Sequence, residues 1–152
     1  MTIYALSTPP GVSGIAIIRL SGPNSLTITK DIIHGTIDKP RMALLKTFYD
    51  SKKEIIDEGI VVWYPKGQSY TGDDLIEFHV HGSKAVINKF LNELSLRSDC
   101  RLAEAGEFTK QALLNNKINL YEAESIADLL NAETEGQRIQ ALRLKNSSPL
   151  FM

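Results

Sequence analysis

A carboxylate and two imidazoles alternate in the stretch YTGDDLIEFHVHGS, residues 70–83, as Glu77, His79 and His81. Because successive side chains of a β-strand point to opposite faces, these three would share one face of a sheet. A carboxylate with two imidazoles could hold zinc or iron. Neighbours on one strand face stand about 7 Å apart, however, and no further cluster of Cys or His follows. Pairing of both histidines with backbone groups or carboxylates is therefore the simpler interpretation.

Glu77 allows a second interpretation of its own. It lies between Ile76 and Phe78, so its carboxylate would be partly buried and would need hydrogen-bond donors. One source of donors is a lysine or arginine on the next strand. The other is a ligand whose edge offers two parallel donors, such as N3–H and the 2-amino group of a pterin. Spacing alone favours the ion pair.

Two other stretches contain glycines and isolated cations. In TPPGVSGIAIIRLSG, residues 8–22, the glycines Gly11 and Gly14 would permit close backbone approach, and Arg19 interrupts an apolar strand. In AGEFTKQALLNNKIN, Lys117 falls in a loop between two expected helices. Taken singly, such cations usually extend into solvent.

The elements that must position these residues indicate an α+β fold with a mixed or antiparallel sheet and packed helices. Short segments rich in β-branched residues predict strands, and apolar residues at helical spacing predict helices. The first helix is expected to begin at Asn24 or Ser25 and to close at Gly35. Strands are expected at 2–8, 14–21, 44–50, 54–67 and 73–82, and helices at 22–35 and 83–99.

The last part of the chain is predicted to be helical. Gly106 and Glu107 would open a helix, and Asn119 with Glu122 forms a capping-box pattern. The following stretch, 120–145, lacks proline and would form a helix roughly 38 Å long, whose apolar stripe needs partner helices. We therefore expect a domain over residues 1–118 and the first helix of a larger helical domain over 119–152.

Composition bounds the class of protein. The 152 residues are 43% hydrophobic, enough for one domain with a core, and the formal net charge of -1 lacks the basic footprint of a dedicated nucleic-acid-binding domain. The single cysteine, Cys100, excludes an internal disulfide and is expected to be a half-buried structural thiol. No leader or membrane-spanning pattern is present, so a cytoplasmic location and no membrane contact are expected.

Three stretches in order, TPPGVSGIAIIRLSGP, YTGDDLIEFHVHGS and AGEFTKQALLNNKINLYEAESIADLLNAET, closely resemble the N-terminal part of the tRNA-modification GTPases of the MnmE (TrmE) family. The resemblance covers residues 2 to 143. It implies a folate-binding and dimerisation domain similar to the tetrahydrofolate-binding part of the glycine-cleavage aminomethyltransferase. No G-x-x-x-x-G-K-[ST] phosphate loop occurs in the sequence, so GTP, Mg²⁺ and K⁺ would belong to a G domain outside it.

The resemblance also implies a function and partners. The family protein is a homodimer that works with an FAD-dependent partner of the MnmG/GidA type. It modifies carbon 5 of the wobble uridine in tRNA, with 5-formyl-tetrahydrofolate as the one-carbon donor. Two alternatives remain: a dimerisation module without ligand, and a folate-dependent one-carbon transferase with Glu107 or Asp74 as acid or base.

The family's folate-binding residues carry over to Arg19, Glu77 and Lys117. Glu77 would take the pterin edge, while Arg19 and Lys117 would supply positive charge for the formyl oxygen or the glutamyl carboxylates. No catalytic or metal-binding residue is expected. Secondary candidates for the pocket are Gly11, Gly14, Gly82 and Tyr70, and the sequence departs from the family pattern at Ser83, Ala105, Gln111, Asn116 and Asn119.

Overall fold

The computed structural model describes residues 1–8, 14–122 and 124. The chain divides into two compact units. The first comprises Met1–Ser69 and Asp73–Leu102, and the second comprises Tyr70–Gly72 and Ala103–Met152. The expected long helix over 120–145 falls almost entirely outside the described residues, and the expected domain boundary at residue 118 stays a prediction.

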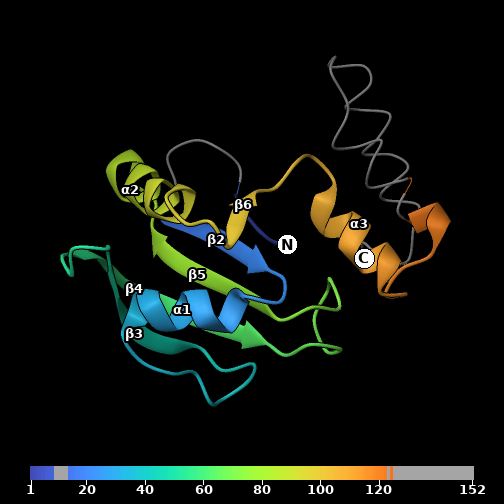
Figure 1. Cartoon of the computed structure of the whole chain (residues 1–152), viewed down its shortest axis with the longest axis horizontal. Helices are drawn as coiled ribbons and strands as arrows, with labels where there is room; N and C mark the ends of the chain where they lie inside the picture. The colour runs from blue at the N-terminus through green and yellow to red at the C-terminus, as the bar shows by residue number, and fades with distance from the viewer. Residues whose placement is uncertain (9–13, 123, 125–152) are drawn as a thin grey trace. The chain divides into compact units, whose positions relative to one another are not determined.

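A six-stranded mixed sheet forms the first unit, in the order β3-β4-β5-β2-β1-β6 (Figure 1). Each pair of neighbouring strands is antiparallel except β1 and β6, which are parallel. The predicted α+β class with a mixed sheet is therefore confirmed. The strands are β1 (Thr2–Leu6), β2 (Ile15–Ser21), β3 (Leu44–Tyr49), β4 (Ile55–Tyr64), β5 (Leu75–His81) and β6 (Cys100–Leu102).

Among the described strands of the first unit, β6 is the one that the sequence pattern missed. It has three residues, too few to show a periodicity, and it pairs with β1 from Thr2 to Tyr4. The helix predicted over 83–99 is also shorter than expected: α2 covers Lys84–Ser95, and Leu96 is its C-cap.

The two faces of the sheet differ because apolar and polar residues alternate along its central strands. In β5, Phe78 and Val80 are buried, whereas Glu77 and His79 are partly exposed. The register places Ile18 of β2 opposite Phe78, so both strands turn their apolar sides to the same core. The other face, which we call the open face, carries Glu77 and His79.

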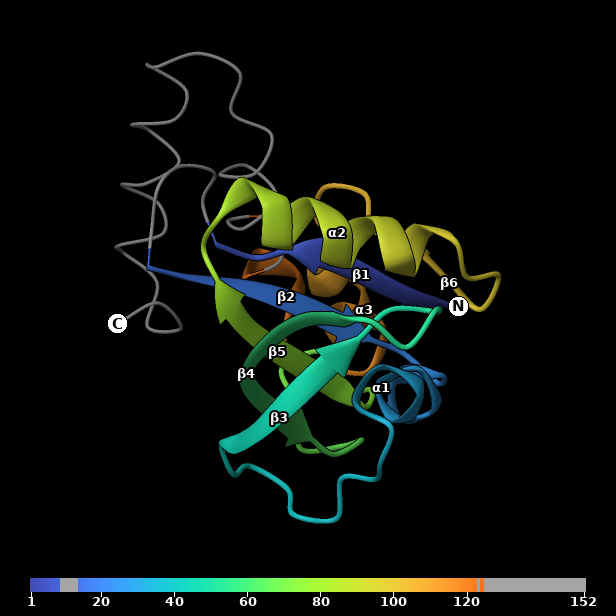
Figure 2. The ribbon, with the colours of Figure 1, turned by 90° about the vertical axis from the view of Figure 1, so that its left-hand side faces the viewer.

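Helices α1 (Ser25–Ile33) and α2 cover the core face of the sheet. Figure 2 shows α1 end-on and α2 from the side, so their axes are steeply inclined to each other. Phe90 of α2 packs between Phe48 and Phe78, with ring centroids 5.6 and 4.9 Å away. Such aromatic contacts stabilise a core beyond the area they bury.

The start of α1 at Ser25 is as predicted, whereas its end differs. Asn24 occupies the N-cap position, but its side chain makes no cap bond and donates instead to the Asp99 carbonyl at 3.2 Å. At the other end, His34 rather than Gly35 adopts the left-handed conformation, with φ of 53°. The His34 ring stacks on Tyr49 at 4.4 Å, a contact that holds this conformation in place.

Gly59, in the middle of β4, lies in close contact with the backbone of β5. A Cβ atom there would overlap the carbonyl oxygen of His79 and lie 3.1 Å from the Phe48 ring. Only glycine avoids this overlap, so the position sets how closely β4 and β5 pair.

The second unit contains α3 (Glu107–Leu114), which begins after Gly106 as predicted. Asn116 has φ of 59°, the left-handed conformation that asparagine tolerates better than most residues. The predicted cap at Asn119 is confirmed, since the Glu122 N–H donates to Asn119 Oδ1 at 2.8 Å, while the Glu122 carboxylate accepts from the Asn119 side-chain amide at 3.1 Å. The first of these bonds marks a helix start at the end of the described residues.

Cys100 is buried more completely than expected, at 5% exposure. Its thiol donates to the Leu94 carbonyl at 3.4 Å, and burial raises the pKa of Cys100 to about 11. The Cys100 thiol is therefore part of the core.

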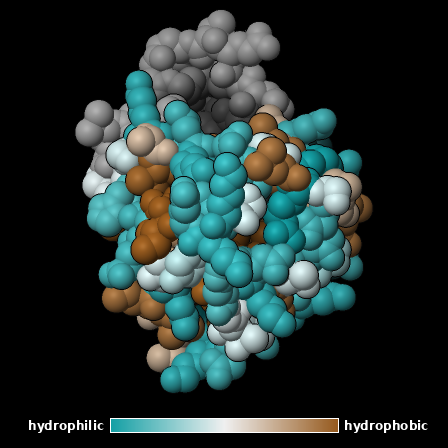
Figure 3. Space-filling model, turned by 60° about the vertical axis from the view of Figure 1, so that its left-hand side comes forward, coloured by the Kyte–Doolittle hydropathy of each residue, from teal (hydrophilic) through white to brown (hydrophobic). Residues whose placement is uncertain are grey.

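Hydrophilic side chains cover most of the face in Figure 3, with separate apolar groups between them. No described helix is long and apolar enough to cross a membrane.

Candidate functional site

The β2–β5 register brings Arg19 and Glu77 directly opposite each other on the open face. Arg19 donates through its terminal nitrogen to Glu77 Oε2 at 3.2 Å, and the two side chains are 28% and 15% exposed. The ion pair expected between neighbouring strands is thus present, and its cation, Arg19, is itself one of the candidate folate-binding residues. The strand arginine does not simply extend into solvent.

His79 bonds the second oxygen of the same carboxylate. Its Nε2 lies 3.3 Å from Glu77 Oε1, and its side chain is 28% exposed. A carboxylate offers about four acceptor positions, two on each oxygen. Arg19 and His79 occupy one on each oxygen, so one acceptor position remains on each side for a further donor.

The neighbourhood of Glu77 is partly apolar. Val62 of β4 lies opposite it in the register, and Tyr64 is two residues further along that strand. Burial raises the pKa of the Tyr64 phenol, and the negative charge of Glu77 raises it further. The Glu77 carboxylate is 15% exposed and lies beside an apolar neighbour, surroundings in which hydrogen bonds are stronger than in water.

His81, two residues beyond His79, has its own carboxylate partner. Both its backbone N–H and its ring Nδ1 lie 2.8 Å from the Asp57 carboxylate. The simpler interpretation of the histidines, pairing with nearby carboxylates, is confirmed for His79 and His81. Among the described residues, no group of three or more His, Cys, Asp or Glu side chains is arranged to hold a metal ion.

The candidate glycines lie at one end of the same two strands. Gly82 follows β5 and donates its N–H to the Gly14 carbonyl at 3.2 Å, directly before β2. Both are five residues from the charged pair, about 17 Å along the strands. Among the described residues, none comes close enough to a Cβ at Gly14 to require glycine there. Gly11 lies outside the described residues.

Tyr70 and Lys117 belong to the second unit. The Tyr70 hydroxyl lies 3.2 Å from the Thr109 hydroxyl, and the residue is 38% exposed, so it is not a core tyrosine. The backbone N–H of Lys117 donates to the Ala112 carbonyl and ends α3.

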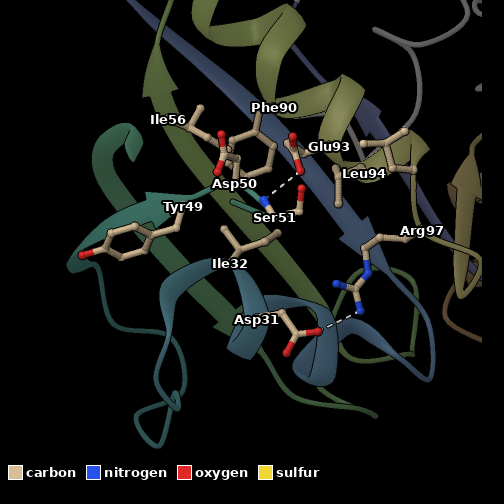
Figure 4. A pocket seen from close by; sticks show the side chains of 11 residues that line it. Asp31, Ile32, Tyr49, Asp50, Ser51, Ile56, Phe90, Glu93, Leu94 and Arg97 are labelled. Carbon is tan, nitrogen blue, oxygen red and sulfur yellow. Dashed lines mark hydrogen bonds and ion pairs between the residues drawn. The ribbon is translucent and has the colours of Figure 1, made fainter. Parts of the chain in front are cut away.

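A cavity of about 190 Å³ lies on the core side of the sheet, between α1, α2 and the turn after β3 (Figure 4). Its apolar floor includes Ile32 and Phe90. Its charged groups bond within the protein, since Asp31 pairs with Arg97 at 3.0 Å and Glu93 accepts the Ser51 N–H. No candidate residue lines it, and the open face remains the candidate site.

Sequence reasoning missed two contacts of this site. The Glu77–His79 bond joins residues at i and i+2 of a strand, and their shared face was the available signal. Asp57 gave no signal, because its contact with His81 depends on the pairing of β4 with β5.

Comparison with known proteins identifies the family. The model of the family described as GTP-binding protein TrmE N-terminus matches residues 2–117. The proteins named tRNA modification GTPase MnmE from Pelagibacter ubique and Maricaulis maris are 52% and 48% identical, over 96% and 97% of this chain. The one from Brucella anthropi is 45% identical over 97%. The chain spans 33% of the length of each of these relatives. This chain therefore belongs to the family of the TrmE N-terminus.

Proposed function

We propose that this chain contributes a tetrahydrofolate site and a homodimer contact to a tRNA-modifying GTPase. The observation that carries the proposal is the Glu77 carboxylate on the open face, held by Arg19 and His79 with one acceptor position left on each oxygen. The N3–H and 2-amino groups of a pterin are two parallel donors, one for each of these two acceptor positions. The ligand that fits the resemblance is 5-formyl-tetrahydrofolate.

In the whole protein this site serves wobble-uridine modification. The folate supplies the one-carbon unit, an FAD-dependent partner of the MnmG/GidA type supplies redox chemistry, and a G domain outside this chain binds GTP. Arg19 and Lys117 contribute positive charge for the anionic or carbonyl groups of the folate. These roles rest on the resemblance and on the residues that match the family motifs.

Among the alternatives, the independent one-carbon transferase has the weaker support. Asp74 accepts hydrogen bonds from the Trp63 indole at 3.1 Å and from the Lys66 N–H at 3.0 Å. Glu107 accepts from the Glu104 N–H at 2.7 Å. Both candidate acids therefore already have structural hydrogen bonds that explain their presence.

Calorimetric titration of the 152-residue chain with 5-formyl-tetrahydrofolate tests the proposal. A charge-assisted contact is worth about 1.5–3 kcal/mol, so Glu77→Ala is expected to weaken binding tenfold or more. Glu58→Ala removes an exposed carboxylate from neighbouring β4 and serves as the matched control, with unchanged affinity expected.

Light scattering after size-exclusion chromatography reports the oligomeric state of the same samples. A dimer that binds folate supports both parts of the proposal. A folded dimer that does not bind folate would leave the dimerisation module as the function of this chain. A monomer would contradict the homodimer contact.

A further inference from the structure

We propose that His79 is a positioning residue for the Glu77 carboxylate and thereby sets the affinity of the site for the pterin edge. This inference rests on the proposed function and deepens it. No feature of the sequence assigned His79 such a role, since the spacing alone left it among paired strand histidines.

The end of a glutamate side chain is free to rotate unless partners hold it. Rotation about the last side-chain bond of glutamate is broad, so a carboxylate held by one partner still turns about that bond. Arg19 holds Oε2 from the neighbouring strand at 3.2 Å. His79 holds Oε1 from the same strand at 3.3 Å. Partners on both oxygens, from two directions, determine the plane of the carboxylate.

The surroundings keep the His79 ring in its place. In the register, Ile17 of β2 and Ile60 of β4 lie opposite His79 on its two sides, and both are partly buried. Two flanking β-branched side chains restrict the positions open to the imidazole. The ring is therefore itself ordered before a ligand arrives.

The contact also sets a tautomer. To donate to Glu77, the His79 ring must carry its proton on Nε2. His81 bonds Asp57 through Nδ1 instead, so the two histidines of one strand use opposite ring nitrogens. This difference makes the His79 contact detectable in the free protein.

A carboxylate already oriented before binding loses less entropy when it accepts two parallel donors. Because His79 is 28% exposed, its single hydrogen bond is a moderate one. We expect His79→Phe, which keeps an aromatic ring but removes the donor, to weaken 5-formyl-tetrahydrofolate binding about fivefold. His79→Gln offers an N–H donor again and is expected to restore affinity to within about twofold of wild type.

The experiment is calorimetric titration of the full chain, with each His79 variant made in the wild-type and Glu77→Gln backgrounds. If His79 acts through Glu77, His79→Phe has little further effect once the carboxylate is gone. His81→Phe is the matched control, since it makes the same substitution two residues along the same face, and unchanged affinity is expected. Nitrogen-15 NMR of the free protein is expected to show His79 protonated on Nε2.

Several results would overturn the inference. One is a His79→Phe protein whose folate affinity stays within twofold of wild type. Another is an equal loss of affinity from His79→Phe in the wild-type and Glu77→Gln backgrounds, which would mean that His79 acts through the sheet and not through Glu77. An Nδ1-protonated His79 would contradict the contact without any ligand. Failure of the wild-type chain to bind folate is distinguishable, because it overturns the proposed function itself and this inference with it.

Discussion

The sharpest structural prediction concerns Gly59 of β4, whose backbone lies close to the His79 carbonyl of β5. Replacing it by alanine adds one methyl group, and that Cβ would overlap the His79 carbonyl oxygen. The oxygen belongs to backbone, which cannot rotate away as a side chain does. β4 and β5 must therefore separate locally, next to the position where Ile60 and His79 are paired.

The magnitude follows from overpacking. Inserting a methyl group into a packed site costs about 1–3 kcal/mol, and more where backbone must move. Alanine recovers about 0.5–1 kcal/mol of the conformational entropy that glycine loses on folding. Because the obstacle is backbone, the upper end of that cost applies, so we expect a net loss of about 2 kcal/mol, which lowers Tm by about 8–16 °C for a unit of this size. Since His79 contacts Glu77, folate affinity should fall as well.

Thermal unfolding followed by circular dichroism measures this loss. Gly35→Ala is the matched control, because a Cβ there comes no closer than 4.0 Å to its nearest neighbour, the Ile33 carbonyl. The control is expected to keep Tm or raise it slightly. A Gly59→Ala protein with wild-type Tm would refute the reasoning and show that the two strands pair less closely than described.

The remaining predictions concern two titrating groups. The Glu54 N–H, assisted by Lys89 and the Lys52 N–H, lowers the pKa of Asp50. The unfolded chain then binds more protons in acid, so this stabilisation is complete above about pH 4 and is lost as pH falls through the folded pKa. Thermal unfolding between pH 2 and 7 is expected to show Asp50→Asn losing stability at pH 7 but approaching wild type in acid; a constant difference would contradict this. Burial raises the pKa of Cys100 to about 11, so alkylation at pH 8 should be slow in the folded chain and fast in urea, as mass spectrometry measures. Equal rates would show that the thiol is exposed.

Local patterns in the sequence predicted much of the fold. A segment rich in β-branched residues indicated β2, alternating residues indicated β5, and apolar spacing indicated α1 and α2. Capping by Asn119 and the left-handed Asn116 also followed from local chemistry. Ser83, a departure from the family pattern, proved to be the N-cap of α2, where its hydroxyl accepts the Val86 N–H. These features depend on residues within a few positions of one another.

The candidate site required more than local pattern. The sequence indicated that Glu77 needs donors and that Arg19 and the histidines were available, but the partner of each depended on strand register. The pairing of β2 with β5 brings together residues 58 positions apart, and it places Arg19 rather than another cation beside Glu77.

By itself, then, the sequence determined the identity of the charged groups, the helices and central strands that hold them, and the family to which they belong. Only the tertiary structure decided that Arg19 and His79 bond different oxygens of Glu77 and that Asp57 is the partner of His81. It also decided that the three-residue segment Cys100–Leu102 forms strand β6. The physical reason is that hydrogen bonds between strands join distant parts of the chain. Which residues meet depends on the register and packing of the whole sheet, and neither is encoded in a short stretch.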